Sequence, residues 1–173
     1  MKIEIQNELS GSILDIGGGG EGVIGRFFGN RVTAIDSDPQ ELNEAPNTCK
    51  KLLMDATELQ FPPESFDNVT FFYSLMYMTA ETQEKALLEA YRVLRRGGRL
   101  LLWDSEIASA FPNPYVVDLE ICRGSETITT SYGIVKRGSQ SADHFVRLAE
   151  RCGFERIQIK LYRKQLFLEA IKL

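Results

Sequence analysis

Short apolar runs alternate with polar, amphipathic stretches along the chain up to about residue 105. The runs are rich in β-branched and aliphatic residues and too short for helices, which favours buried strands. They lie at residues 12–16, 31–36, 52–54, 66–73 and 99–103. The run at 66–73 is almost uniformly apolar, as expected for a strand that is covered on both faces.

Helical signals fill the intervals between these runs. Residues 22–28 predict a turn or two of helix, and residues 39–45 predict a short helix with Asp38 as N-cap and Pro39 first. Residues 79–94 give the clearest helix, with acids early and one apolar stripe. The stripe consists of Ala86, Leu87, Ala90, Val93 and Leu94. Strands that alternate with helices predict a doubly wound, mostly parallel α/β sheet.

The pattern changes between Glu106 and Ser139. Residues 116–121 alternate loosely, and residues 126–135 are rich in threonine. With Arg123-Gly124-Ser125 between them, these two segments predict a β-hairpin insertion after the fifth strand.

The chain returns to the earlier pattern after this segment. Ser139 or Ser141 is the expected cap of a helix that Gly153 closes. Residues 157–161 and 166–171 then predict a final antiparallel strand pair. The length of 173 residues suits one domain, so we expect a single domain over residues 1–173.

Composition and charge narrow the class of partners. Hydrophobic residues make up 43% and charged residues 25%, as in an ordinary globular protein. The net charge of -4 gives no broad attraction to phosphate backbones, so we expect no nucleic-acid partner. Because the sequence has a single histidine, most ligand patterns of zinc sites are excluded, and we expect no metal site.

Localisation signals are missing from the sequence. Residues 1–5 carry charge early and do not resemble a signal peptide, and no apolar run approaches the length of a membrane span. Cys49, Cys122 and Cys152 show no CxxC spacing, which favours buried, reduced thiols. We therefore expect a cytoplasmic protein with no membrane association.

A glycine cluster at residues 17–22 follows the first strand and opens the first helix. Glycine allows the backbone to turn tightly and to approach a ligand closely, and helix N–H groups there can face an anion. Gly17, Gly19 and Gly22 also fit the G-x-G-x-x-G dinucleotide pattern. Asp15 argues against a dinucleotide, because an acid inside the strand suits a ligand with an ammonium group better than a pyrophosphate.

Two more acids follow successive strands. Asp36 ends the second strand, roughly 20 residues after the first glycine, where a carboxylate can accept hydrogen bonds from ribose hydroxyls. Asp55 follows the third strand and fits either an ordinary Asx turn or a binding site. In series with Asp15 and Asp36, the binding role is favoured.

These segments resemble the class I S-adenosylmethionine-dependent methyltransferases, particularly the small-molecule type that includes ubiquinone and menaquinone biosynthesis enzymes. The resemblance covers about residues 12–104 and is carried by four motifs. They are Asp15-Ile16-Gly17-Gly18-Gly19, Met54 to Pro62, Phe66-Asp67-Asn68-Val69 with Phe72-Tyr73-Ser74-Leu75, and Arg92 to Leu100. The resemblance implies a Rossmann-like fold, S-adenosylmethionine as cofactor and methyl transfer to a small-molecule substrate.

The resemblance also implies roles for nine residues. They are Asp15, Gly17, Gly18 and Gly19 at the methionine moiety, Asp36 and Ser37 at the ribose and adenine, Asp55 and Ala56 at the adenine, and Tyr73 beside the methyl group. This chain departs from the family pattern in two places. A third glycine is displaced from position 21 to Gly22, and Met76-Tyr77 stands where many relatives carry a histidine pair.

No catalytic residue is assigned from the sequence. Glu106, Tyr77 and His144 are candidate bases, and each also fits an ordinary structural role. Two other functions stay open: a binding module that keeps the cofactor without turnover, and an NAD(P)-dependent oxidoreductase. The chain lacks the Tyr-x-x-x-Lys pair of the latter. The 106–139 insertion follows the fifth strand at the ligand-binding edge, so it either walls the acceptor pocket or forms a homodimer interface.

Overall fold

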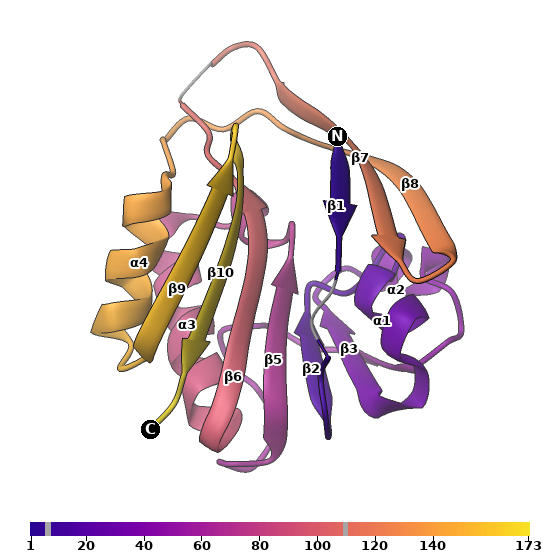
Figure 1. Ribbon diagram of the computed structural model, residues 1–173, viewed down its shortest axis with the longest axis vertical. Coiled ribbons are helices and arrows are strands. Elements are labelled where there is room, and N and C mark those ends of the chain that lie inside the picture. Colours follow the sequence, from indigo (N-terminus) through magenta and orange to yellow (C-terminus); the bar gives the residue numbers. More distant parts are fainter. Residues whose placement is uncertain (6–7, 109–110) are drawn as a thin grey trace.

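The computed structural model describes residues 1–5, 8–108 and 111–173. Its main sheet has seven strands in the order β4-β3-β2-β5-β6-β10-β9 (Figure 1). The strands are β2 (Ile13–Ile16), β3 (Val32–Asp36), β4 (Lys50–Leu53), β5 (Phe66–Phe72), β6 (Leu94–Ser105), β9 (Glu155–Tyr162) and β10 (Gln165–Ile171). The neighbours from β4 to β6 are parallel, and β10 runs antiparallel to both β6 and β9. The predicted Rossmann-like, mostly parallel sheet with an antiparallel C-terminal strand is confirmed.

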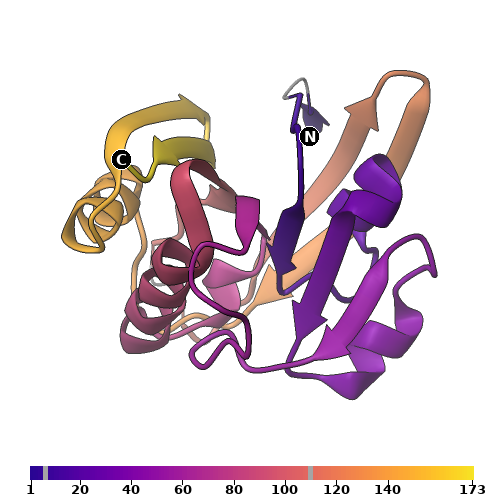
Figure 2. The ribbon, with the colours of Figure 1, turned by 90° about the horizontal axis from the view of Figure 1, so that it is seen from below.

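Helices cover both faces of this sheet. They are α1 (Val23–Phe28), α2 (Pro39–Glu44), α3 (Ala80–Val93) and α4 (Ala142–Arg151), with the short 3-10 turns η1 (Gly29–Arg31) and η2 (Leu75–Tyr77). One apolar cluster joins α3 and α4 to the sheet, and a second joins α1 to the opposite face (Figure 2). The carboxyl ends of the parallel strands are therefore framed by helices on two sides.

The predicted helix caps are present. Asp38 Oδ1 accepts a hydrogen bond from the Gln40 N–H at 2.8 Å, and Ser141, rather than Ser139, caps α4. Helix α3 ends at Val93, one residue earlier than predicted, because Leu94 already pairs with Phe66 in the sheet.

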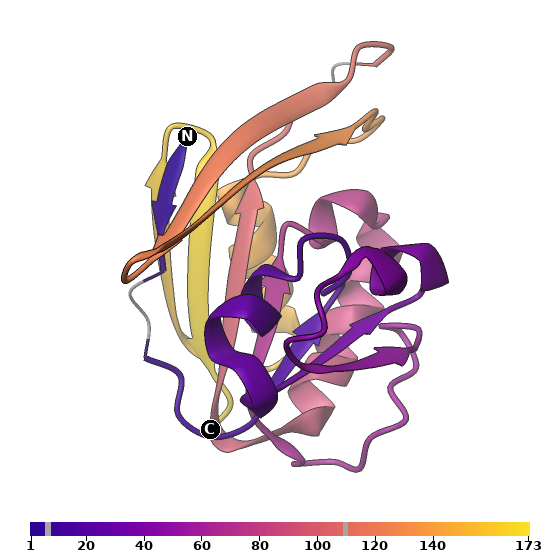
Figure 3. The same ribbon diagram turned by 90° about the vertical axis from the view of Figure 1, so that its right-hand side faces the viewer.

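A second, three-stranded sheet lies over the α1 face of the main sheet (Figure 3). It contains β1 (Lys2–Glu4), β7 (Tyr115–Arg123) and β8 (Glu126–Ile134). Strands β7 and β8 pair antiparallel, from Tyr115 with Ile134 to Arg123 with Glu126, and β1 adds to β7 in parallel. Residues 109–110 of the 106–139 segment lie outside the described residues.

Strand β1 was not predicted. Lys2 and Glu4 are exposed, and only Ile3 between them is partly buried, so the three residues carry almost no periodic signal. Their extended conformation is defined by hydrogen-bonded pairing with residues 120–122 of β7, which are distant in sequence.

The three cysteines differ in burial. Cys122 and Cys152 are buried and Cys49 is half-buried, so the expectation of buried thiols fails for Cys49. In the ranges that the structure describes, no helix combines the length and apolar character needed to cross a bilayer.

Candidate ligand-binding site

A cavity of about 670 Å³ lies at the carboxyl ends of β2 to β5, the edge at which open α/β sheets bind ligands. This volume is in the usual range for a site that holds a small molecule or cofactor. All nine residues to which the resemblance gives a role line this one cavity: Asp15, Gly17, Gly18, Gly19, Asp36, Ser37, Asp55, Ala56 and Tyr73.

The glycine loop is shaped by hydrogen bonds to its neighbours. The N–H groups of Gly17 and Gly18 both donate to the Ile35 carbonyl, at 2.9 and 3.0 Å. Gly17 has φ +75°, and a Cβ there would lie 2.4 Å from the Cβ of Ser74. The loop therefore needs glycine at position 17 for both its backbone angle and its close approach to the end of β5. Gly22 is the N-cap of α1, with φ 56°.

Asp15 is almost fully buried at the cavity wall. Its Oδ1 accepts a hydrogen bond from the Thr70 hydroxyl at 2.7 Å. Burial raises the pKa of Asp15 to about 7; the Thr70 hydrogen bond opposes this rise and the charge of Asp36 adds to it. Since burial disfavours the charged form, a cation in the cavity would favour the ionised carboxylate.

Asp36 is held at the end of β3 by two backbone donors. Its Oδ2 accepts from the Gly19 N–H at 3.3 Å, and its Oδ1 accepts from the Asp38 N–H at 3.0 Å. The Asp36 carbonyl also accepts from the Met54 N–H at 2.9 Å, which positions the segment that follows β4. This contact brings the second and third predicted acids to the same cavity.

Asp55 makes the Asx turn that was considered as an alternative. Its Oδ1 accepts from both the N–H and the hydroxyl of Thr57, each at 2.7 Å, and these hydrogen bonds hold the pKa of Asp55 below its usual value. Asp55 also lines the cavity, together with the adjacent Ala56. The turn occupies one oxygen and leaves Oδ2 for another donor, so the two interpretations of Asp55 are compatible.

Aromatic rings form another part of the cavity wall. Tyr73 follows β5 with φ +52° and stacks on Tyr132 of β8, with ring centroids 5.1 Å apart and planes 4° from parallel. Tyr132 was not predicted to be a site residue. It is one aromatic residue in a threonine-rich alternating strand, and nothing local shows that the strand returns to the cavity. The Thr130 hydroxyl, two residues earlier, donates to Glu21 Oε1 at 2.5 Å.

The position of β8 bears on the two interpretations of the 106–139 segment. Ser131 and Tyr132 line the cavity, as expected for a pocket wall. The dimer interpretation depended on Val116, Leu119 and Ile121. Leu119 and Ile121 pack inward with 1% and 0% exposure, so Val116 alone of these three offers apolar surface to a partner.

Of the three candidate bases, only Tyr77 lines the cavity. Glu106 Oε1 accepts from the Ala142 N–H at 2.9 Å and so supports the start of α4. His144 Nε2 hydrogen-bonds Gln83 Oε1 at 2.7 Å, which joins α4 to α3. The candidate roles of Glu106 and His144 as bases are therefore wrong for this cavity, because both side chains are engaged elsewhere in helix packing. No group of three potential metal ligands is found among the residues that the structure describes.

Comparison with known proteins agrees with this geometry. The model of the methyltransferase domain family matches residues 14–102, just over half of the chain. The ubiquinone/menaquinone biosynthesis C-methyltransferase of Rhizobium rhizogenes is 36% identical over 111 residues, covering 56% of this chain and 42% of that protein. The demethylmenaquinone methyltransferase of Tropheryma whipplei is 27% identical over 160 residues, covering 83% of this chain and 66% of its own.

The chain thus spans less than two-thirds of the length of these relatives. Among solved structures, an S-adenosylmethionine-dependent methyltransferase of Methanosarcina mazei superposes with a TM-score of 0.63 at 20% identity, covering 94% of this chain and 92% of the other. This likeness concerns the fold. Taken with the family match, it places the chain in the methyltransferase domain family, among the class I S-adenosylmethionine-dependent methyltransferases.

Proposed function

We propose that residues 1–173 form a single methyltransferase domain that binds S-adenosylmethionine in this cavity and methylates a small-molecule acceptor. The observation that carries the proposal is the convergence of Asp15, Asp36 and Asp55, from three successive strand ends, on one cavity beside the glycine loop. In this order, the three carboxylates match the hydrogen-bond donors of S-adenosylmethionine, which are its ammonium group, its ribose hydroxyls and its adenine amino group.

The hydrogen-bonding capacity of the three carboxylates fits this cofactor. Asp15 would face its ammonium group, which favours the ionised form of a carboxyl whose pKa burial has raised to about 7. Each Asp36 oxygen accepts one backbone N–H and keeps a lone pair, so the two oxygens can accept both ribose hydroxyls. Asp55 Oδ2 can accept from the adenine amino group.

The glycine loop contributes by its small size. Since the N–H groups of Gly17 and Gly18 already donate to Ile35, we infer that these residues do not serve the site by donating to the methionine moiety. Instead they allow the loop to pack closely, because a Cβ would lie 2.4 Å from Ser74 Cβ at Gly17 and 2.5 Å from Asp15 Oδ2 at Gly18. Ser37 and Ala56 would flank the adenine, and Tyr73 would border the methyl group.

When bound, the cofactor supplies an electrophilic methyl group. The protein's task is then to align an acceptor atom with it and to exclude water, and alignment alone supplies much of the rate. Tyr73 and Tyr77 line the region in which an acceptor would approach. A general base is unnecessary when the acceptor atom is a thiolate, a neutral amine or an acidic carbon.

The surroundings of the enzyme are part of the proposal. We place it in the cytoplasm, because its three cysteines lack the spacing of a disulfide framework or a CxxC motif. A net charge of -4 argues against a nucleic-acid partner, and the lack of a long apolar run argues against a membrane partner. The quinone-biosynthesis relatives make reduced menadione the first acceptor to test. Sedimentation analysis would determine whether the chain forms a homodimer.

Ligand-induced stabilisation tests the cofactor. Thermal unfolding is measured with S-adenosylmethionine, S-adenosylhomocysteine, NAD and NADP. A ligand at 100 times its Kd stabilises the folded state by about 2.7 kcal/mol, so the first two should raise Tm and the nicotinamide cofactors should not. A response only to NAD or NADP would overturn the proposal. Transfer of a labelled methyl group to reduced menadione would then show turnover and so exclude a module that only binds the cofactor.

A further inference from the structure

Apart from Tyr73, the aromatic wall of the cavity is built by residues to which no cofactor role has been given. Phe72, Tyr73, Tyr77 and Tyr132 supply its rings, from β5, η2 and β8. The rings contact one another. The Phe72 ring centroid lies 5.1 Å from that of Tyr73 and 6.4 Å from that of Tyr132, both in edge-on arrangements, and Tyr73 stacks on Tyr132. Tyr132 lies outside the residues that the family model matches, so this part of the wall is not explained by the family match.

The hydroxyl groups of the stacked rings of Tyr73 and Tyr132 differ in their hydrogen bonds. The Tyr73 hydroxyl donates to Gln165 Oε1. The Tyr132 hydroxyl makes no hydrogen bond to any residue that the structure describes. Burial raises its pKa, as do the nearby charges of Glu21 and Asp15, so the group remains a protonated donor. Tyr132 therefore brings an apolar ring and an uncommitted O–H to the cavity.

The charge of the lining is one-sided. Its carboxylate side chains are those of Asp15, Glu21, Asp36, Glu41, Glu44 and Asp55, and no lysine, arginine or histidine joins them among the described residues. Lys136, the cation that follows β8, donates instead to the carbonyls of Met76 and Met78, at 2.8 and 3.2 Å.

Glu21 is the acid that belongs to the aromatic side of the cavity. Its Oε1 accepts from Thr130, and residues 130 and 132 lie on the same face of β8 because side chains alternate along a strand. Burial raises the pKa of the Tyr77 hydroxyl and a hydrogen bond with the Gly133 backbone opposes this rise. The charges of Asp104, Glu41 and, least, Glu21 add to it. An anionic group between these rings would lose water and gain no opposite charge, whereas a cation would meet π faces and a carboxylate.

We propose that Tyr132, together with Tyr77 and Glu21, forms the acceptor subsite, and that this subsite takes an uncharged or positively charged acceptor and rejects carboxylates and phosphates. The inference depends on the proposed function, because it assigns the remainder of the cavity to the acceptor. It specifies the charge of the acceptor at the end that enters the cavity.

Three phenols of similar size and different charge test this subsite. Tyramine is cationic at neutral pH, 4-propylphenol is neutral, and 3-(4-hydroxyphenyl)propionate is anionic. Their binding to the protein saturated with S-adenosylhomocysteine is measured by isothermal titration calorimetry. We expect tyramine and 4-propylphenol to bind more tightly than the propionate by at least about tenfold. Equal or tighter binding of the propionate, or no binding of any probe at millimolar concentration, would overturn the inference.

Matched variants assign the effect to residues. Tyr132→Leu should weaken 4-propylphenol binding by about tenfold, whereas Tyr132→Phe keeps the ring and should retain most of the affinity. Glu21→Gln should reduce the advantage of tyramine over 3-(4-hydroxyphenyl)propionate, because a negative charge that attracts the amine and repels the carboxylate is removed. Tyr162→Leu, at a tyrosine that is 65% exposed on β9, is the control and should change nothing. Unchanged binding in both Tyr132→Leu and Glu21→Gln would contradict the assignment.

The measurement of S-adenosylhomocysteine affinity separates the two proposals. A protein that folds but does not bind S-adenosylhomocysteine contradicts the proposed function itself. A protein that binds it and then shows no preference among the three phenols contradicts only the acceptor subsite. Thermal unfolding of each variant shows whether a loss of binding reflects a loss of folding.

Discussion

Tyr73 and Gln165, which lie 92 positions apart in the sequence, are joined by a hydrogen bond from the Tyr73 phenol to Gln165 Oε1. The same oxygen accepts from the Ser105 hydroxyl at 2.8 Å, and Gln165 Nε2 donates to the Tyr115 hydroxyl at 3.2 Å. Tyr73 has φ +52°, a conformation that a bulky residue keeps only where its surroundings enforce it. A glutamine on β10 therefore helps to fix the orientation of a ring in the cavity.

Replacing this glutamine should destabilise the protein. Gln165→Leu leaves the buried Tyr73 hydroxyl without its acceptor, and we expect the free energy of unfolding to fall by about 1–3 kcal/mol in urea titrations. The double variant with Tyr73→Phe should recover part of this loss, because the stranded hydroxyl is then absent. Gln158→Leu, at an exposed position on β9, serves as the control. A Gln165→Leu protein as stable as the wild type would show that this hydrogen bond is unimportant.

Gly17 and Gly97 have nearly the same φ, so alanine variants at the two positions can separate the effect of backbone strain from that of steric contact. Gly17 has φ +75° beside Ser74, and Gly97 has φ +76° with open space where a Cβ would lie. Both alanine variants carry a similar strain of about 1 kcal/mol, but only Gly17→Ala must also displace the end of β5. We expect Gly17→Ala to lose more than about tenfold in S-adenosylmethionine affinity, measured by calorimetry, and Gly97→Ala to keep it. Equal losses of S-adenosylmethionine affinity in the two variants would show that backbone strain, and not contact with Ser74, causes the loss.

The pKa of Asp15 predicts how cofactor affinity depends on pH. The carboxyl is neutral below its raised pKa of about 7, and an ammonium group selects the ionised form. S-adenosylmethionine affinity should therefore rise as the pH increases from about 5 towards 7. The measurement is kept below about pH 7, because an α-amino group is half deprotonated at about pH 7.7–8.0.

Asp15→Asn is the matched variant for this effect. The amide keeps an oxygen for the Thr70 hydroxyl but cannot ionise, so affinity should be lower and nearly independent of pH over this range. If the variant followed the same pH profile as the wild type, the titrating group would lie elsewhere, and Asp15 would not be the partner of the ammonium group.

The parts of the fold that the sequence predicts are those with local causes. The strands that lead to Gly17 and Asp36 are short apolar runs, and the cap at Asp38 is formed by a neighbouring N–H, so both can be predicted from adjacent residues. The strand before Asp55 was predicted at residues 52–54 and lies at Lys50–Leu53, because two lysines outside the apolar run also pair with β3. The family motifs then predict nine residues that the fold brings to one cavity. This agreement follows from topology, because parallel strands bring their carboxyl ends to one edge of the sheet.

The parts that escaped prediction depend on contacts between distant segments. Strand β1 exists through its pairing with β7, and Tyr132 reaches the cavity because the small sheet folds over the α1 face. Leu119 and Ile121 alternate as an exposed interface strand would, but they face the main sheet. Periodicity shows which residues share a face and does not show what covers that face.

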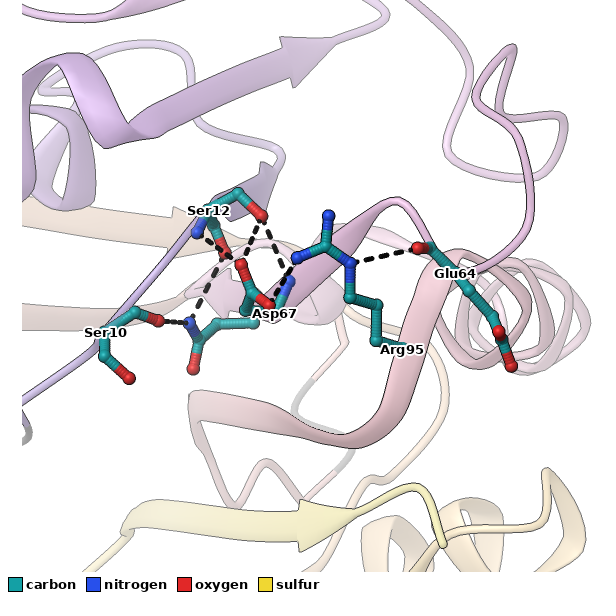
Figure 4. Close-up of polar contacts among 6 residues, drawn as sticks. Ser10, Ser12, Glu64, Asp67 and Arg95 are labelled. Carbon is teal, nitrogen blue, oxygen red and sulfur yellow. Dashed lines mark hydrogen bonds and ion pairs between the residues drawn. The ribbon is translucent and has the colours of Figure 1, made fainter.

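The amino-terminal edge of the sheet, away from the cavity, contains a polar cluster around Asp67 (Figure 4). Asp67 Oδ2 accepts from both the N–H and the hydroxyl of Ser12 at 2.8 Å, and Oδ1 accepts from Arg95 at 2.6 Å. Arg95 also donates to the Glu64 carbonyl at 3.1 Å. The Ser12 hydrogen bonds and the Arg95 guanidinium hold the pKa of Asp67 below its usual value, although partial burial opposes them.

The lowered pKa of Asp67 gives a stability prediction with a definite sign. The ionised Asp67 side chain contributes to the free energy of unfolding at pH values above 3.8, which is its pKa in the unfolded state. This contribution is lost as the pH falls through the lower pKa that Asp67 has in the folded state. Asp67→Asn should lower the free energy of unfolding at pH 7 by about 1–2 kcal/mol, and the difference from wild type should shrink in acid. S-adenosylmethionine affinity should not change, since Asp67 is not part of the cavity lining. Glu150→Gln, at an exposed acid of α4, is the control; a constant difference between Asp67→Asn and wild type at all pH values would show that the ionised form of Asp67 does not stabilise this edge of the sheet.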